Sequence, residues 1–204
     1  MKKTICLILL TTLLLSLTAC SFFSPSETTP GTTKPPAPSV YEVLSSLSEK
    51  SYLRVELTVT TKTEFAELSA NYVLNQSSVA YRIEQLSTFP NDGSVPSEYK
   101  TTFTGNALVQ NGEIVEFDGN DIVLPTYDEL SGNFHFEESN FKNVASQNGR
   151  LTADVISPSA FYGKTVDMSQ MHVEVEYSST SFHKITLTYR TVSASVTTVY
   201  TFEN

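Results

Sequence analysis

Apolar and polar residues alternate with a period of two over most of the chain after residue 50. This alternation is typical of strands with one buried and one solvated face. The first such segment, 52–63, is expected to bury Leu53, Val55, Leu57 and Val59. Further strands are predicted at 65–74, 79–86, 99–109, 113–117, 141–145, 151–156, 171–177, 183–191 and 196–202.

Several of these strands are joined by short turns. Asn111-Gly112 and Asn148-Gly149 are each flanked by alternating segments, and Asn-Gly favours the type I′ turn of a two-residue hairpin because both positions need positive φ. Asn75-Gln76-Ser77 predicts a further turn, and 90–98 a longer loop. Consecutive strands with short connections predict an antiparallel meander.

Three segments depart from the strand pattern, and a fourth, 134–137, keeps it. Ser39 lies three residues before Glu42, which is the spacing of a capping box, and apolar residues at helical spacing follow to residue 50. Segment 121–132 is apolar around Pro125, which favours a short helix or a loop lying over the sheet. Phe134 and Phe136 alternate with His135 and Glu137 in a strand-like manner, and 158–163 is expected to be irregular.

The predicted fold class is therefore α+β and β-dominated. We expect an antiparallel curved sheet or half-barrel, with one short N-terminal helix and a helical or irregular plug segment. Residues 39–204 form a single β-rich domain in this interpretation.

The N-terminus carries a different pattern. Lys2 and Lys3 precede an apolar run from Ile5 to Leu17, which is too short to span a bilayer and is typical of a signal peptide. Leu17-Thr18-Ala19-Cys20 matches the lipobox of bacterial lipoproteins. We therefore expect residues 1–19 to be a lipoprotein signal peptide and Cys20 to be the lipidation site, acylated at its thiol. The alternative is an ordinary secretory signal that ends near Ala19.

Residues 20–38 then form a lipidated cysteine and a Pro/Ser/Thr-rich tether. This interpretation predicts a lipid-anchored protein on the extracytoplasmic face of the cell membrane, held by palmitate-like acyl chains. Cys6 is removed with the signal peptide and Cys20 is acylated, so no thiol is left for a disulfide, a metal or a nucleophile.

Charge argues against a nucleic-acid partner. The whole chain has 13 basic and 22 acidic residues. Loss of Lys2 and Lys3 with the signal peptide leaves 11 basic and 22 acidic residues, a net charge of −11. Such a balance repels phosphate backbones, so binding through a basic patch is excluded as a class.

No enzymatic motif is present in the sequence. His135 with Glu137, and His172 with Glu174 and Glu176, would each share one face of a strand, which permits a metal site; a solvated strand face is the favoured interpretation. His183 has no such neighbours. Gly-x-Ser-x-Gly, HExxH and phosphate-binding loops are absent from the sequence. We therefore expect a protein that is not an enzyme and needs no catalytic residue, metal or cofactor.

The aromatic content raises the question of a ligand. The chain has 10 Tyr, 12 Phe and no Trp, and such rings are most often core. One short helix and segment 121–132 would not fully cover so large a sheet. Either the sheet curls on itself or it encloses apolar space that could hold an apolar ligand.

The element order resembles a known superfamily. A capped helix at 39–50 leads into a long strand at 52–63, a Gly-centred hairpin lies at 107–119, and the chain ends in the strand pair 185–189 and 196–202. This order is similar to that of the LolA/LolB-like lipoprotein carriers, which include the LppX-type lipoproteins. The resemblance implies a half-barrel cavity that binds or carries a lipid or acyl chain. The alternatives are a non-enzymatic interaction or sensory module that binds an envelope protein or a glycan through its sheet surface.

Overall fold

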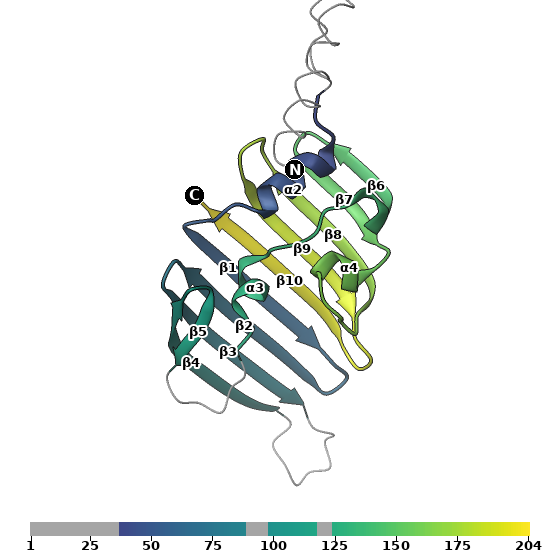
Figure 1. Cartoon of the computed structure of the whole chain (residues 1–204). Helices are drawn as coiled ribbons and strands as arrows, with labels where there is room; N and C mark the ends of the chain where they lie inside the picture. The colour runs from purple at the N-terminus through teal and green to yellow at the C-terminus, as the bar shows by residue number, and fades with distance from the viewer. Residues whose placement is uncertain (1–36, 89–97, 118–123) are drawn as a thin grey trace, which may run out of the picture. The chain divides into compact units, whose positions relative to one another are not determined.

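A computed structural model describes residues 37–88, 98–117 and 124–204 of the chain, and its strands form one antiparallel sheet (Figure 1). The sheet is curved and open and does not close into a barrel. Its ten strands are β1 (Arg54–Lys62), β2 (Ala66–Asn75), β3 (Ser78–Thr88), β4 (Glu98–Gln110), β5 (Glu113–Phe117), β6 (Phe141–Gln147), β7 (Arg150–Val155), β8 (Ser169–Tyr177), β9 (Phe182–Arg190) and β10 (Ser195–Glu203). The β-dominated α+β class is confirmed.

The first strand, β1, lies in the middle of the sheet, and the strands that follow it complete first one half of the sheet and then the other. The strand order is β5-β4-β3-β2-β1-β10-β9-β8-β7-β6. After β5 the chain crosses the sheet and resumes at the opposite edge with β6 (Figure 1). The last strand then pairs with the first, from Arg54 opposite Glu203 to Lys62 opposite Ser195. The two halves of the sheet are therefore joined by the ladder between β1 and β10, and they can separate only if those hydrogen bonds break.

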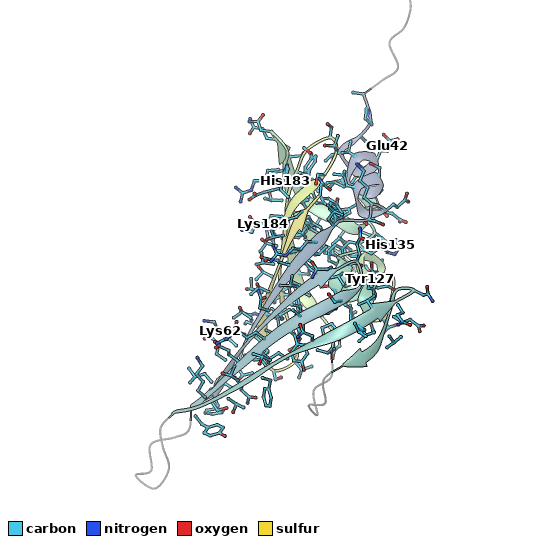
Figure 2. The ribbon with its side chains drawn as sticks, turned by 90° about the vertical axis from the view of Figure 1, so that its left-hand side faces the viewer. Glu42, Lys62, Tyr127, His135, His183 and Lys184 are labelled. Atoms are coloured by element: carbon cyan, nitrogen blue, oxygen red, sulfur yellow. The ribbon has the colours of Figure 1, made fainter. Side chains whose placement is uncertain are left out.

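The pairing register places apolar side chains on one face. Leu57 lies opposite both Tyr72 and Tyr200, and Tyr72 lies opposite Tyr81. All four of these side chains are buried. We call this the inner face; the helices and the crossing segment 124–140 lie on it. Figure 2 shows the division, with Tyr127 and His135 on the helix side and Lys184 on the opposite, outer face.

The N-terminal helix forms as expected. Helix α2 (Val40–Ser48) begins at Ser39, whose hydroxyl accepts from the Glu42 N–H, while the Glu42 carboxylate accepts from the Ser39 N–H. This capping box satisfies donors that a helix start leaves without partners. Leu44 and Leu47 are fully buried and seat the helix on the sheet.

Two more short helices cover the inner face. Helix α3 (Tyr127–Ser131) confirms a helical turn within 121–132; it has its own capping box between Thr126 and Glu129 and ends at Gly132, whose φ is 71°. Helix α4 (Pro158–Tyr162) corrects the prediction that 158–163 is irregular. Its signals were present but short: Ser157 caps it, proline stands in the first turn and Gly163 is left-handed.

Both Asn-Gly turns are confirmed. Asn111 and Gly112 have φ of 53° and 77°, and Asn148 and Gly149 have φ of 51° and 75°. These are the left-handed values that a type I′ turn requires at both central positions. The β4–β5 and β6–β7 hairpins therefore begin where the sequence predicts.

Two local predictions were wrong. Leu53 was expected on the buried side of the first strand, yet it lies on a bend and is 57% exposed. Tyr52 takes the inner position instead, with its ring 4.7 Å from that of Phe202. Residues 134–137 are not a strand, because their backbone bonds run to helices: the Phe134 N–H donates to the Ser48 hydroxyl and the His135 N–H to the Phe161 carbonyl.

Some predictions fall outside the described residues. They concern the signal peptide, Cys20 and the tether up to residue 36, the loop at 89–97, and residues 118–123.

Candidate functional site

Phenylalanine rings fill the space between the inner face and its helices. The Phe161 ring of α4 lies 4.7 Å from Phe134, 5.5 Å from Phe136 and 5.8 Å from Phe141, measured between ring centroids. Phe136 also lies 5.7 Å from Phe182. We call these five residues the aromatic cluster; each is at most 7% exposed. These rings therefore form part of the hydrophobic core, which is the more common role of aromatic side chains.

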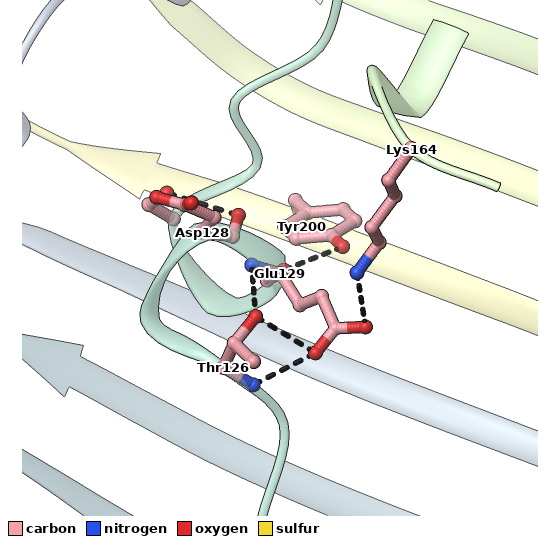
Figure 3. Close-up of polar contacts among 6 residues, drawn as sticks. Thr126, Asp128, Glu129, Lys164 and Tyr200 are labelled. Carbon is pink, nitrogen blue, oxygen red and sulfur yellow. Dashed lines mark hydrogen bonds and ion pairs between the residues drawn. The ribbon is translucent and has the colours of Figure 1, made fainter. Parts of the chain in front are cut away.

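A cluster of polar residues connects α3 and the loop after α4 to the sheet through hydrogen bonds (Figure 3). The Lys164 ammonium donates to the Glu129 carboxylate at 2.6 Å, which joins the loop after α4 to α3. The Tyr200 hydroxyl of β10 donates to the Glu129 carbonyl at 2.9 Å. The other Glu129 carboxylate oxygen accepts from the N–H and the hydroxyl of Thr126. Glu129 thus links α3, α4 and β10.

The net pKa shifts of the ionisable groups in and beside this cluster differ in sign, because hydrogen bonds oppose the effect of burial at Glu129. Burial alone would raise the pKa of Glu129, but the hydrogen bonds from Lys164 and Thr126 outweigh it and the net pKa is lowered. Burial raises the pKa of Tyr162, Tyr189 and Tyr200. At neutral pH the carboxylate is charged and the phenols are neutral, so the cluster is a stable cross-link rather than a proton-transfer site.

A pocket of about 380 Å³ lies at one end of α2, between that helix, α3 and the β2–β3 turn. Its apolar wall is formed by Val55 and Leu74 of the inner face, together with the rings of Tyr52 and Tyr127. The rest of its lining is polar: Ser48, Glu49, Lys50, Ser51, Asn75, Gln76, Asp128, Ser131 and Asn133. We refer to it as the α2–α3 pocket.

Several polar side chains in the α2–α3 pocket have no partner among the described residues. Within the described part of the chain, the carboxylates of Glu49 and Asp128, and the amides of Asn75 and Gln76, make no hydrogen bond or ion pair. Lys50 is different, because its ammonium donates to the Thr180 carbonyl at 2.5 Å. The pocket therefore presents acceptors and amide donors to a ligand, with an acidic bias.

A second surface on the inner face is apolar. Val59 lies opposite Ala70, which lies opposite Ile83, which lies opposite Phe103, so one row of apolar residues crosses β1 to β4. Ala70 and Ile83 are buried, whereas Val59 and Phe103 are only partly buried. We refer to this as the apolar row. Tyr99 is on the same side of β4 and is 60% exposed.

The histidines do not come together. His172 is on the outer face of β8, and its Nδ1 lies 2.9 Å from the Asp154 carboxylate. Its predicted neighbour Glu174 pairs with Arg150 at 2.6 Å. Figure 2 shows His135 on the helix side of the sheet and His183 on the other. Over residues 37–88, 98–117 and 124–204, no three His, Cys, Asp or Glu residues are grouped as a metal site would need.

The described residues contain no helix that could span a membrane. None of the helices there is both long enough and apolar enough to cross a bilayer. Cys20 and the apolar run before it lie outside those residues.

Sequence reasoning missed the α2–α3 pocket and the polar cluster. Their residues come from α2, the β2–β3 turn, α3 and the loop after α4, which are far apart in the chain. The capping box Thr126–Glu129 was a readable signal for α3. Nothing in the sequence pairs Glu129 with Lys164 or brings Asp128 near Gln76.

Comparisons with known proteins return no relative: no protein-family model matches this chain, and no curated protein matches it in sequence.

Proposed function

We propose that this protein is a membrane-tethered, extracytoplasmic binding domain that holds a small polar ligand in the α2–α3 pocket. The observation behind this proposal is the set of unpartnered carboxylates and amides around one pocket with an apolar wall. Ligand sites commonly combine an apolar wall with a few polar groups that fix orientation. The filled space around the aromatic cluster favours a ligand at this pocket over one inside the sheet.

The tether part of the proposal depends on Cys20. A thiol after Leu17-Thr18-Ala19 would take a diacylglyceryl group, and two or more acyl chains give stable anchoring where one does not. We expect Cys20→Ala, expressed in a bacterial host that processes lipoproteins, to keep residues 1–19 and to carry no fatty acid, both measured from the intact mass of the protein. An acylated Cys20→Ala protein without residues 1–19 would contradict lipidation at Cys20. Ser21→Ala, the neighbouring substitution, serves as its control.

Ligand binding is tested on the full chain with Cys20→Ser, which removes acylation without shortening the protein. A small-molecule extract of the host envelope is added, and amide chemical shifts are followed by NMR. We expect shifts at 48–52, 74–76 and 127–133, the segments that line the pocket. Shifts confined to other segments, or none at all, would refute the pocket as the binding site.

A second candidate function is favoured by the apolar row. Val59 and Phe103, at the two ends of the row, remain partly exposed beside buried Ala70 and Ile83. Contact with an acyl chain would remove this apolar surface from water. In this alternative the protein binds or carries a lipid, as the resemblance to lipoprotein carriers implies.

The two candidates give different results with lipid. If the apolar row binds acyl chains, an apolar fluorescent dye binds the Cys20→Ser chain and is displaced by phospholipid. Phe103→Ser then abolishes binding of the dye. A lipid-extract mass spectrum of the protein purified from its host gives the independent check. If the preparation contains no lipid and the dye does not bind, the carrier function is refuted while the pocket proposal stands.

A further inference from the structure

The residues that line the α2–α3 pocket limit the classes of ligand that it could bind. The apolar surface that the pocket offers a ligand comes mainly from the rings of Tyr52 and Tyr127, because Val55 and Leu74 are only 3% and 5% exposed. A ligand with apolar faces and with hydroxyl or amine groups on its edges would contact these rings and hydrogen-bond to the amides and carboxylates on the other sides. A sugar ring has this division, with C–H groups on its faces and hydroxyls around its rim.

The polar residues around the pocket can form hydrogen bonds with the hydroxyls of a sugar ring. The amides of Asn75 and Gln76 each offer two donors and one acceptor oxygen, and the carboxylates of Glu49 and Asp128 accept only. A sugar hydroxyl donates once and accepts from others, so adjacent hydroxyls can engage an amide and a carboxylate together. These four side chains make no bond to described residues that a ligand would first have to break.

The charges of the lining residues further limit the class of ligand. Glu49 and Asp128 are both acidic. Lys50, the one cation among the described residues that line the pocket, donates a hydrogen bond to the Thr180 carbonyl. A second negative charge within the pocket would be repelled by both carboxylates at low ionic strength. An amine would be attracted. Acidic sugars are therefore disfavoured relative to neutral and amino sugars.

We propose that the α2–α3 pocket binds a neutral or amine-bearing saccharide unit, with a sugar face against Tyr127 and hydroxyls on Gln76 and Asp128. The inference rests on the proposed function, because it names the ligand class of the same pocket. A volume of about 380 Å³ lies near the lower limit for small-molecule sites, which suits one or two sugar rings.

The test is an NMR titration of the Cys20→Ser chain with four probes. These are N,N′-diacetylchitobiose, glucosamine, glucuronic acid and tetramethylammonium, added separately at low salt. We expect the first two to shift amides at 48–52, 74–76 and 127–133 and to bind at least tenfold more tightly than glucuronic acid. We expect tetramethylammonium to give no saturable shift, because it carries charge but no hydroxyls.

Variants assign the roles. Tyr127→Ala and Gln76→Ala should each weaken diacetylchitobiose binding about tenfold, and Asp128→Asn should reduce the discrimination against glucuronic acid. Matched controls are Tyr99→Ala, Gln85→Ala and Asp167→Asn, which are exposed and outside the pocket; these should bind as the parent does. Gln76 is in an exposed turn, so its variant remains informative if Tyr127→Ala fails to fold.

The outcomes separate the two proposals. Pocket shifts with envelope extract but with neither sugar overturn the saccharide inference and leave the proposed function standing. Pocket shifts with tetramethylammonium alone overturn it in favour of a simple cation site. An absence of pocket shifts with both extract and sugars refutes both.

Discussion

Removal of the Phe161 ring should destabilise the fold more than any other single truncation in α4. Phe161 is fully buried and touches four other aromatic rings, from Phe134 at 4.7 Å to Phe141 at 5.8 Å between centroids. Phe→Ala truncations in cores cost about 3–5 kcal/mol, and a site that cannot collapse lies at the upper end. Three of the neighbouring rings, those of Phe134, Phe136 and Phe141, belong to segments that other contacts hold in place. They can therefore move little into the cavity that the truncation would leave.

We therefore expect Phe161→Ala to lower the free energy of unfolding by about 4 kcal/mol. For a domain of this size that corresponds to a fall of about 8–16 °C in Tm. The assay is urea unfolding of the Cys20→Ser chain, with the midpoint compared at unchanged m-value. Val144→Ala, at an exposed position of the edge strand β6, should change stability by at most about 0.5 kcal/mol.

A loss below about 1.5 kcal/mol for Phe161→Ala would refute the reasoning, because that is the range of a volume-conserving core exchange. It would mean that the aromatic cluster leaves room for rearrangement. The space around α4 would then be a candidate ligand cavity after all.

Two further predictions concern local chemistry. Gly149→Ala should lower the free energy of unfolding, measured by chemical denaturation, more than Gly112→Ala does. Both positions have positive φ, but a Cβ at 149 would lie 2.5 Å from the Tyr177 carbonyl oxygen, whereas the nearest atom to a Cβ at 112 is 3.8 Å away. Equal losses of unfolding free energy would contradict this prediction. The stability that the lowered pKa of Glu129 provides is present above the ordinary carboxyl pKa and is lost as pH falls through the lowered value. Glu129→Gln should therefore flatten the acid side of a stability-versus-pH curve, and an unchanged slope would show that the ion pair with Lys164 is not formed in solution.

Much of the fold could be predicted because its signals are local. Period-two alternation gives each strand, and Asn-Gly marks both type I′ turns. The capping box at Ser39 marks the start of α2. These signals depend on residues within a few positions of each other, so no knowledge of tertiary contacts is needed.

Predictions failed where a residue's environment is supplied by distant segments. Phe134 and Phe136 alternate like strand residues, but the Phe134 N–H donates to the Ser48 hydroxyl of α2 and the Phe136 carbonyl accepts from the Ser45 hydroxyl of the same helix. Leu53 continues the apolar alternation, yet Tyr52 takes its place beside Phe202 from the end of the chain. Alternation alone cannot say which element will cover a side chain.

By itself, the sequence determined the antiparallel strands, their turns and the face that each strand buries, because backbone geometry ties side-chain direction to position. It also provides the basis for expecting a lipid anchor at Cys20. Only the tertiary structure decided that the first and last strands pair, that phenylalanine rings fill the space under the helices, and that Asp128 and Gln76 line one pocket. These are contacts between residues far apart in the chain, and they exist only once the crossing segment has packed on the sheet.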